Sequence, residues 1–316
     1  MVNIVSCYMS MLHKIMKLAG MHPKEVEIEP GTVIHFWVNN NNDNDDDDNN
    51  AKKKSRRRPA LVLIHGFAGD GILTWQFQVL ALRKKYSLYI PDLLFFGGSH
   101  TTSKAKITPR FHADCFAKGL RKLGVEEKCV VVGFSYGGFV GFQMAEHHPE
   151  LVDSMVVTGS VLALSESISS KSLERIGFSS WPDYLMPNSV EGVKVLLDIG
   201  SYSFPWMPKV FYKHYLEVMF GNRKERVELL EALVVKDEDV TNHQFKQRIH
   251  LLWGNEDEIF NLEEANNLKG KLGGKTELRV VKKAGHLAPL ERPCAFTKCL
   301  VKMLDSLAID NKHASG

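Results

Sequence analysis

A serine between two glycines is the first group in the sequence with clear reactive potential. Ser135 lies in the run Gly133-Phe134-Ser135-Tyr136-Gly137, which follows an apolar stretch and precedes a stretch of helical character. Such a turn between a strand and a helix holds the serine in a strained conformation with its hydroxyl exposed above the sheet. The glycines are needed because the two backbones nearly touch. The pattern predicts that Ser135 is a nucleophile.

A serine hydroxyl becomes a good nucleophile only beside a histidine that takes its proton and a carboxylate that orients the histidine. Of the thirteen histidines, His286 alone follows a strand near the C-terminus and lies in a glycine-containing loop. Three acids, Glu256, Asp257 and Glu258, follow the strand that ends at Trp253. Spacing does not choose among them, but the order serine, acid, histidine is the one expected for this chemistry on a parallel sheet.

Acyl transfer also needs backbone donors for the oxygen that becomes negative. The segment LVLIHGFAGDG (61–71) ends a predicted strand in a glycine-rich loop, from which the N–H of Phe67 can reach the site. The N–H of Tyr136, next to the serine, is the second predicted donor. His65 is expected to brace the loop rather than to take part in the reaction.

The composition is that of a globular protein able to bury a large core. The chain has 316 residues, 44% of them hydrophobic and 24% charged, which excludes a disordered or fibrous protein. Its five cysteines form no CxxC pair, which argues against a disulfide framework or a zinc ribbon and favours a reducing compartment. With no HExxH motif, no close cluster of cysteine and histidine and no GxGxxG after a strand, neither a metal nor another cofactor is predicted.

Charge is concentrated in one low-complexity segment, residues 39–58, where a run of Asn and Asp precedes KKKSRRR. Such a segment has no apolar side chains to bury, so we expect a disordered loop. Outside it acids and bases nearly balance, so nucleic acid is not an expected partner. The apolar N-terminal extension (1–24) lacks the features of a signal peptide and is expected to be a docked or surface helix. A cytoplasmic location is predicted, with a nuclear location or peripheral contact with a membrane as alternatives.

Short apolar runs rich in β-branched residues alternate with helical stretches along most of the chain. Runs of this kind are typical of strands covered on both faces, and their alternation with helices predicts an α/β fold with a mostly parallel, doubly wound sheet. The expected strands are 25–29, 32–38, Leu61–Ile64, Leu88–Ile90, Cys129–Val132, Met155–Val157, His250–Trp253 and Leu278–Val281. Residues 162–221 break the pattern and predict a helical cap inserted after the sixth strand, between core segments 25–161 and 222–316.

Together these motifs resemble the α/β-hydrolase superfamily of capped serine hydrolases, close to its monoacylglycerol-lipase-like and carbon–carbon-bond hydrolase branches. The likeness covers about residues 25–308 and rests on HGF, Pro91-Asp92-Leu93, the serine turn, WGxxD and GH…ERP. It implies that Asp257 is the catalytic acid and that Asp92 is structural. One departure is PDLLFFGGSH, where Phe95 and Phe96 stand in place of smaller or polar residues.

The predicted function is therefore hydrolysis of a small-molecule carboxylic ester with an apolar acyl group, monoacylglycerol-like, through a Ser-Asp-His triad and an acyl-enzyme. Aromatic side chains of the cap and of the segment PDLLFFGGSH are expected to line the substrate pocket: Phe95, Trp206, Phe211 and Tyr215. Two alternatives stay open. One is a hydrolase of carbon–carbon bonds in a ring-cleavage-type diketone, and the other is a ligand receptor of the same fold that hydrolyses slowly.

Overall fold

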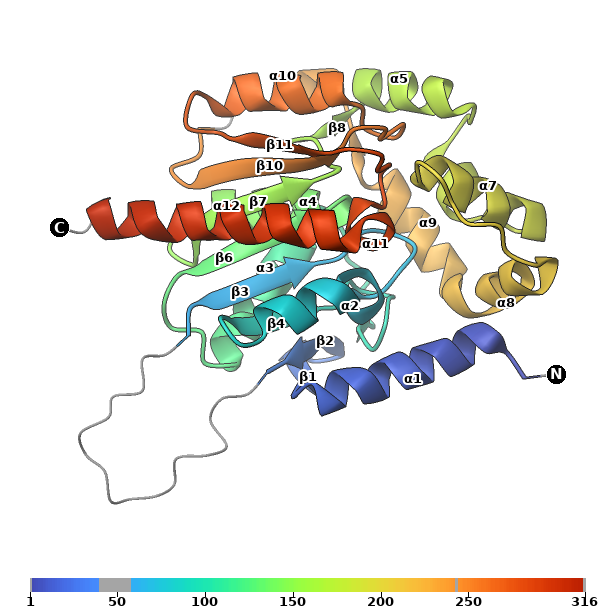
Figure 1. The fold of residues 1–316 in the computed structure, drawn as a ribbon, viewed down its shortest axis with the longest axis horizontal. Coiled ribbons are helices and arrows are strands. Elements are labelled where there is room, and N and C mark those ends of the chain that lie inside the picture. The colour runs from blue at the N-terminus through green and yellow to red at the C-terminus, as the bar shows by residue number, and fades with distance from the viewer. Residues whose placement is uncertain (1, 40–57, 242–243, 315–316) are drawn as a thin grey trace.

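The computed structural model describes residues 2–39, 58–241 and 244–314. The predicted charged insert at 39–58 therefore lies outside the described residues, except for its two end residues. Figure 1 shows a central sheet with helices on both faces and a group of helices at one end of the strands.

The central sheet has nine strands: β1 (His22–Glu29), β2 (Thr32–Val38), β3 (Ala60–Ile64), β4 (Ser87–Pro91), β5 (His100–Thr101), β6 (Cys129–Phe134), β7 (Val152–Thr158), β10 (Arg248–Gly254) and β11 (Leu278–Val281). Their order is β1-β2-β4-β3-β6-β7-β10-β11, with the short β5 paired to β2. The pairs of β2 are antiparallel, and every pair from β4 to β11 is parallel. The predicted mostly parallel sheet is confirmed. The sequence had not predicted β5, whose two residues are too few to form a pattern.

The side chains of β3 point alternately to the two faces of the sheet, which explains why helices cover both faces. Leu61 and Leu63 belong to the core layer under α2 (Gly71–Leu82) and α12 (Pro293–Ala314), whereas Val62 and Ile64 belong to the layer under α3 (Pro109–Lys122) and α4 (Tyr136–His147). All four side chains are fully buried. Since successive side chains of a strand point to opposite faces, one apolar run serves both layers. Two further helices, α10 (Leu262–Leu272) and the short α11 (Ala288–Glu291), complete the core.

Among the described residues between β7 and β10, five α-helices occur: α5 (Glu166–Ile176), α6 (Trp181–Leu185), α7 (Val190–Gly200), α8 (Lys209–Met219) and α9 (Arg223–Glu231). We call this segment, Glu166–Glu231, the insertion. The side chains of Ser165, Ser180 and Ser189 cap the starts of α5, α6 and α7, which accounts for where these helices begin. Helix α9 extends the helical run past the predicted end at residue 221. Its sequence, RKERVELLE, is polar enough to resemble a surface helix of the core.

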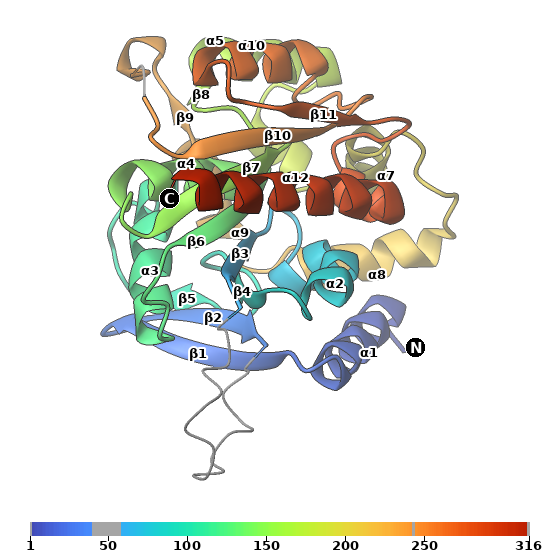
Figure 2. The ribbon, with the colours of Figure 1, turned by 60° about the vertical axis from the view of Figure 1, so that its left-hand side comes forward.

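Two short strands join the ends of the insertion. Strand β8 (Leu164–Ser165) pairs in parallel with β9 (Val234–Val235), and a 3₁₀ turn, Asp237–Asp239, follows. The chain thus enters and leaves the insertion at the same place. In Figure 2 the pair lies beside α5, away from α7 and α8.

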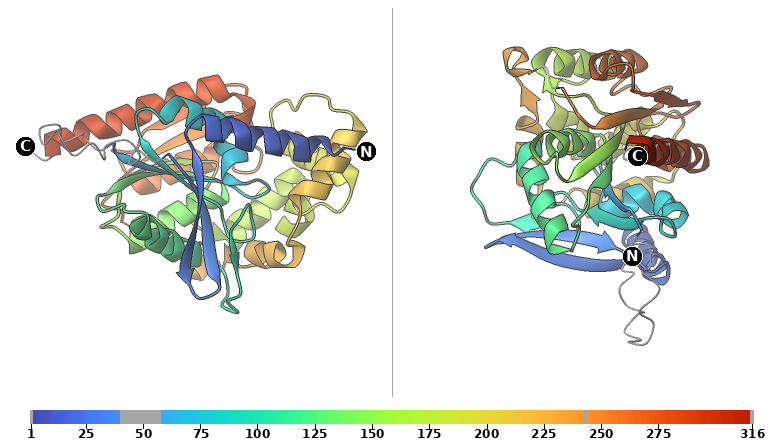
Figure 3. Two further views of the ribbon diagram at one scale, coloured as in Figure 1. Left: turned by 90° about the horizontal axis from the view of Figure 1, so that it is seen from below. Right: turned by 90° about the vertical axis from the view of Figure 1, so that its left-hand side faces the viewer.

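The N-terminal residues form α1 (Ile4–Leu18), whose first turn is capped by the side chain of Asn3. This helix lies beside α2 and α8, as two views agree (Figures 1 and 3). Strand β1 begins at His22, slightly before the predicted start of the core at residue 25. No helix in the described part of the chain has the length and apolar character needed to cross a membrane.

Candidate active site

Ser135 lies at the turn between β6 and α4 in the strained conformation that its glycines predict. Its φ is 52° and its ψ is −119°, a left-handed region that costs free energy in any residue other than glycine. A Cβ at Gly133 would come within 2.5 Å of the carbonyl oxygen of Gly137, and a Cβ at Gly137 within 2.4 Å of that of Ile64. Both positions must therefore be glycine for the turn to form and for the serine to stand at the end of β6.

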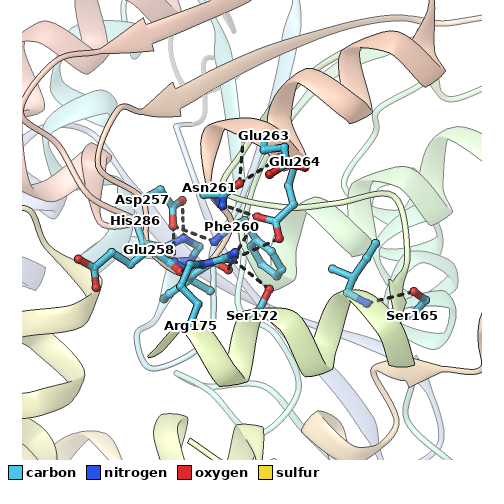
Figure 4. A network of polar contacts seen from close by, with 12 residues as sticks. Ser165, Ser172, Arg175, Asp257, Glu258, Phe260, Asn261, Glu263, Glu264 and His286 are labelled. Atoms are coloured by element: carbon cyan, nitrogen blue, oxygen red, sulfur yellow. Dashed lines mark hydrogen bonds and ion pairs between the residues drawn. The ribbon is translucent and has the colours of Figure 1, made fainter. Parts of the chain in front are cut away.

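His286 and Asp257 come together with Ser135 although they are far apart in the sequence. The Oγ of Ser135 is 2.9 Å from Nε2 of His286, and Nδ1 of the same ring is 2.9 Å from Oδ2 of Asp257. The other oxygen of Asp257 accepts hydrogen bonds from the N–H groups of Ile259 and Phe260. Figure 4 shows the buried carboxylate and the imidazole facing each other. The contacts fix the orientation of the histidine ring.

The structure distinguishes the three neighbouring acids. Asp257 is buried against His286, whereas Glu256 and Glu258 are exposed. Glu256 accepts a hydrogen bond from the side chain of Asn255. Of these three acids, only Asp257 has the geometry required of a triad member.

Phe67 and Tyr136, the residues predicted to supply the oxyanion donors, line the same cavity as Ser135. The N–H of Tyr136 is at the first position of α4, where a helix has no internal acceptor for it. Phe67 follows β3, and its ring packs against those of Phe96 and Tyr136 at centroid distances of 5.0 and 6.3 Å. The N–H groups of Phe67 and Tyr136 remain the predicted donors for the oxygen of an ester carbonyl.

His65 holds the loop of Phe67 in place. Its Nε2 accepts the N–H of Leu93, so the proton is on Nδ1, which donates to the carbonyl of Gly66. Complete burial lowers the pKa of His65 and keeps the ring neutral. The side chain is structural, as the sequence predicted.

Asp92, which is buried, and Asp70, which is partly buried, form a second polar group behind this loop. Asp92 accepts the N–H of Gly71 and contacts Nδ1 of His35 at 2.7 Å, a structural arrangement that matches the role implied by the resemblance. Asp70 caps α2 by accepting the N–H of Leu73. Burial and the nearby charge of Asp92 raise the pKa of Asp70 to about 7.

Ser135 and His286 line two cavities of very different size. The smaller, about 30 Å³, has room for about one water-sized group. The larger, about 410 Å³, runs between the insertion, α2 and α11, and most of its wall is apolar. Its apolar lining includes Leu73, Leu185, Leu196, Leu197, Phe204, Phe211, Leu287 and Leu290. The larger cavity is the one able to hold an acyl chain.

Two of the four predicted pocket residues line this larger cavity. Phe211 and Tyr215, one turn apart on α8, have ring centroids 5.9 Å apart. The hydroxyl of Tyr215 also donates to the carbonyl of Ala68, in the loop after β3. Tyr215 therefore joins the insertion to the oxyanion loop as well as forming part of the wall.

The other two predictions are wrong as to place. Trp206 is 85% exposed and is not among the residues that line either cavity at the serine. Phe95 also lies outside both linings; its φ is 70°, and its carbonyl accepts hydrogen bonds from Asn222 and Arg226 of the insertion. Aromatic character identified residues near the site but did not indicate which way each side chain faces.

The sequence analysis missed Arg175, on α5. Its guanidinium donates to the carbonyls of Glu258 and Ile259, at 2.6 and 2.7 Å, and pairs with Glu264. Figure 4 shows these contacts beside Asp257. Arg175 thus fixes the loop that carries the acid, and no local pattern reveals a contact with residues more than eighty positions away.

Glu291 was also missed as a functional residue, although it stands in the motif ERP. Its carboxylate accepts N–H groups from Tyr202 and Ser203 of the insertion and from Gly285, which precedes His286. One side chain therefore ties the insertion to the histidine loop.

Comparison with known proteins agrees with this fold. A family model described as the alpha/beta hydrolase fold matches residues 59–187. The crystal structure of a putative lipase (lip1) from Acinetobacter baumannii superposes with a TM-score of 0.77 at 18% identity, covering 96% of this chain and 97% of that one. The chain has the α/β-hydrolase fold. The resemblance seen in the sequence is confirmed.

Two further similar proteins are a lipase and a dienoate hydrolase. Lipase 1 of Psychrobacter immobilis is 28% identical over 235 residues, which cover 73% of this chain and 72% of the lipase. The 2-hydroxy-6-oxo-6-phenylhexa-2,4-dienoate hydrolase of Rhodococcus sp. strain RHA1 has a TM-score of 0.69 at 21% identity, covering 91% of this chain and 98% of that one. The lipase relative supports a hydrolase that acts on esters in general; the second likeness concerns the fold alone.

Proposed function

We propose that this α/β-hydrolase is a serine hydrolase that cleaves carboxylic esters with an apolar acyl group, using Ser135, His286 and Asp257. The observation that carries the proposal is the continuous contact from Asp257 through His286 to Ser135 at the wall of an apolar cavity. The insertion acts as the cap that closes this cavity over the serine.

In the first half of the reaction, Ser135 Oγ attacks the ester carbonyl while Nε2 of His286 takes the hydroxyl proton. Asp257 keeps the proton of Nδ1 in place and stabilises the imidazolium. The carbonyl oxygen becomes negative, and the N–H groups of Phe67 and Tyr136 bind it, aided by the positive end of α4. His286 then gives its proton to the departing alcohol, which leaves an acyl-enzyme.

In the second half, water replaces the alcohol. His286 takes a proton from the water, the resulting hydroxide attacks the acyl carbonyl, and the same donors bind the oxyanion. Collapse of this intermediate releases the carboxylic acid and returns the proton to Ser135. The smaller cavity beside the serine has room for about one water-sized group, which suits this step.

The larger cavity supports an uncharged, apolar acyl group. Its 24 lining residues, all in the described part of the chain, include no lysine and no arginine. Glu291 is the one acid among them, and backbone N–H groups engage its carboxylate. An acyl chain could bury each CH₂ here with a gain of about 0.8 kcal/mol.

The same wall argues against the carbon–carbon-bond alternative. A dienoate, the substrate class in the name of the Rhodococcus hydrolase, carries a carboxylate. A buried carboxylate needs a cation or several hydrogen-bond donors. Since the larger cavity of this chain has no cationic side chain in its lining, an ester with an apolar acyl group fits it better.

The test is labelling and turnover on the same purified protein. A fluorophosphonate should label Ser135, and p-nitrophenyl butyrate should turn over rapidly. Ser135→Ala should lose both, while Ser103→Ala, a change at a serine that lines neither cavity at Ser135, should keep both. Labelling with almost no turnover would instead indicate the ligand-receptor alternative. Absence of labelling in the folded wild-type protein would refute the nucleophile.

A further inference from the structure

Helix α1 has apolar side chains on its exposed surface as well as on the side that packs against the rest of the protein. Val5, Leu12 and Met16 are buried against the body of the protein. Beside them on the helix, five apolar side chains are 39% to 88% exposed: Ile4, Tyr8, Met11, Ile15 and Leu18. At 3.6 residues per turn these five form one continuous strip, and together with the buried residues they occupy about half of the helix circumference. An exposed apolar strip of this kind on a protein surface is typical of a binding face.

Helix α2 continues this strip. Phe77 and Leu80 are also large exposed apolar residues, and they lie one and two turns after Leu73 on the same side of α2. The two helices are joined where the hydroxyl of Tyr8 donates to the side chain of Gln76. We call the seven exposed residues of α1 and α2 the apolar face.

The apolar face borders the entrance of the larger cavity. Leu73 and Gln76 line that cavity from α2, and the exposed residues Ser203 and Pro205 line it from the insertion, so the cavity reaches the surface between them. The exposed Trp206 follows directly in the chain. Helix α1 is also fixed to the insertion, since the N–H of Ile4 donates to His214. Figure 2 shows α1, α2 and α8 on one side of the molecule.

The charged residues within the segments that carry the apolar face are of one sign, although Glu217 of α8 accepts a hydrogen bond from Asn3 and Asp305 pairs with Lys85. Residues 2–24 and 71–91, which contain both helices, include no aspartate and no glutamate. Their bases are Lys14, Lys17, Lys24, Arg83, Lys84 and Lys85. Lys14 and Lys17 are exposed on the polar side of α1, next to the strip. Amphipathic helices of this composition lie in the interface of membranes that contain anionic lipids.

We propose that the apolar face docks on the surface of an anionic phospholipid bilayer and turns the entrance of the larger cavity toward the lipid. Side chains of α1 and α2 enter the boundary between headgroups and acyl chains, and Lys14 and Lys17 contact the headgroups. An apolar ester could then pass from the bilayer into the cavity without crossing water. The delivery of substrate rests on the proposed function, whereas the docking itself does not.

Co-sedimentation with vesicles tests the docking without turnover. The full-length protein should bind vesicles of phosphatidylcholine with 30% phosphatidylserine more strongly than vesicles of phosphatidylcholine alone. The double variant Met11→Asp/Leu18→Asp should lower the partition coefficient about tenfold or more. Lys14→Gln/Lys17→Gln should remove most of the preference for the anionic vesicles. The matched control Asn266→Asp/Asn267→Asp adds the same charge on α10 and should bind as wild type does.

Every variant should hydrolyse a soluble ester and be labelled by fluorophosphonate at the wild-type rate, since none lies in the site. A docking failure is thereby separated from a failure of the proposed function. The proposal is overturned if wild-type protein does not bind the anionic vesicles, or if Met11→Asp/Leu18→Asp binds them equally well. It is also overturned if sedimentation velocity shows that the apolar face joins two copies of the chain and vesicles do not compete.

Discussion

The loops at the ends of the strands and the insertion contribute to the same cavity in different ways. The loops place their groups through the backbone: the strained φ of Ser135 and the two N–H groups that hold Asp257. The insertion is connected to the loops by long side chains, such as Arg175 and Tyr215. Backbone geometry tolerates little change, whereas a wall of side chains can vary. We therefore expect the loops to control the rate and the insertion to control the choice of substrate.

The largest effect should follow from changes in the loops themselves. Ser135→Ala and His286→Ala should each lower kcat for a soluble ester by about 10⁶-fold, because triad members act as a unit. Steady-state rates with p-nitrophenyl butyrate measure this, with the exposed His100→Ala as the control for the histidine. Nearly full activity in either variant would refute the proposed triad mechanism.

The acid should come next. Asp257→Asn should cost about 10⁴-fold in kcat, since an amide favours the wrong histidine tautomer. The matched variants Glu256→Gln and Glu258→Gln change exposed neighbours and should stay within about twofold of wild type. If one of these neighbours had the large effect and Asp257→Asn the small one, the acid would be misassigned.

Arg175 tests whether a side chain of the insertion affects the rate of the reaction, as the loops are expected to, or only the binding of substrate. Arg175→Met should lower kcat about 10- to 100-fold with little change in KM, because the acid loop loses the donors that fix it. Arg175→Lys should restore part of the rate. Lys171→Met, on the same helix, serves as the control. A change in KM alone would mean that Arg175 shapes the cavity rather than the position of Asp257.

Within the insertion, Phe211 and Trp206 should differ on soluble substrates. Wild-type kcat/KM should rise up to about fourfold per CH₂ from acetyl to medium-chain p-nitrophenyl esters. Phe211→Ala should flatten this rise and spare acetate, since Phe211 lines the cavity; Trp206→Ala should leave the series unchanged because Trp206 faces solvent. Equal losses at all lengths for Phe211→Ala would show that it holds the insertion together.

The smallest effect concerns stability behind the oxyanion loop. The pKa of Asp70 is about 7 in the fold and 3.8 without it, so the fold holds this proton to higher pH and loses stability as the pH rises from about 4 to about 7. Asp70→Asn can still cap α2. It should raise the melting temperature by about 3 °C or more at pH 8, with no difference near pH 4. Glu166→Gln, at an exposed helix start, should show no such pH dependence.

Much of the core could be predicted because its pattern is local. The apolar runs predicted the sheet, and the two glycines around Ser135 predicted the turn. Only glycine fits at those two positions, because a side chain would clash with the neighbouring backbone. The strand ends then bring His286 and an acid to one edge. What could not be predicted depends on distant contacts or on orientation. Arg175 reaches across more than eighty positions, and the outward direction of Trp206 follows from packing that a list of aromatic residues does not contain.

The short pairing of β8 with β9 has a consequence for how such enzymes diversify. Because the insertion leaves and rejoins the core at adjacent points, Leu164–Ser165 and Val234–Val235, its length can change without shifting the register of β7 or β10. The segment between these points is therefore a natural unit of exchange. A chimera that replaces it with the equivalent segment of a relative should inherit the donor's substrate range while keeping the reacting groups of the recipient, which makes this junction a rational cut point for recombination.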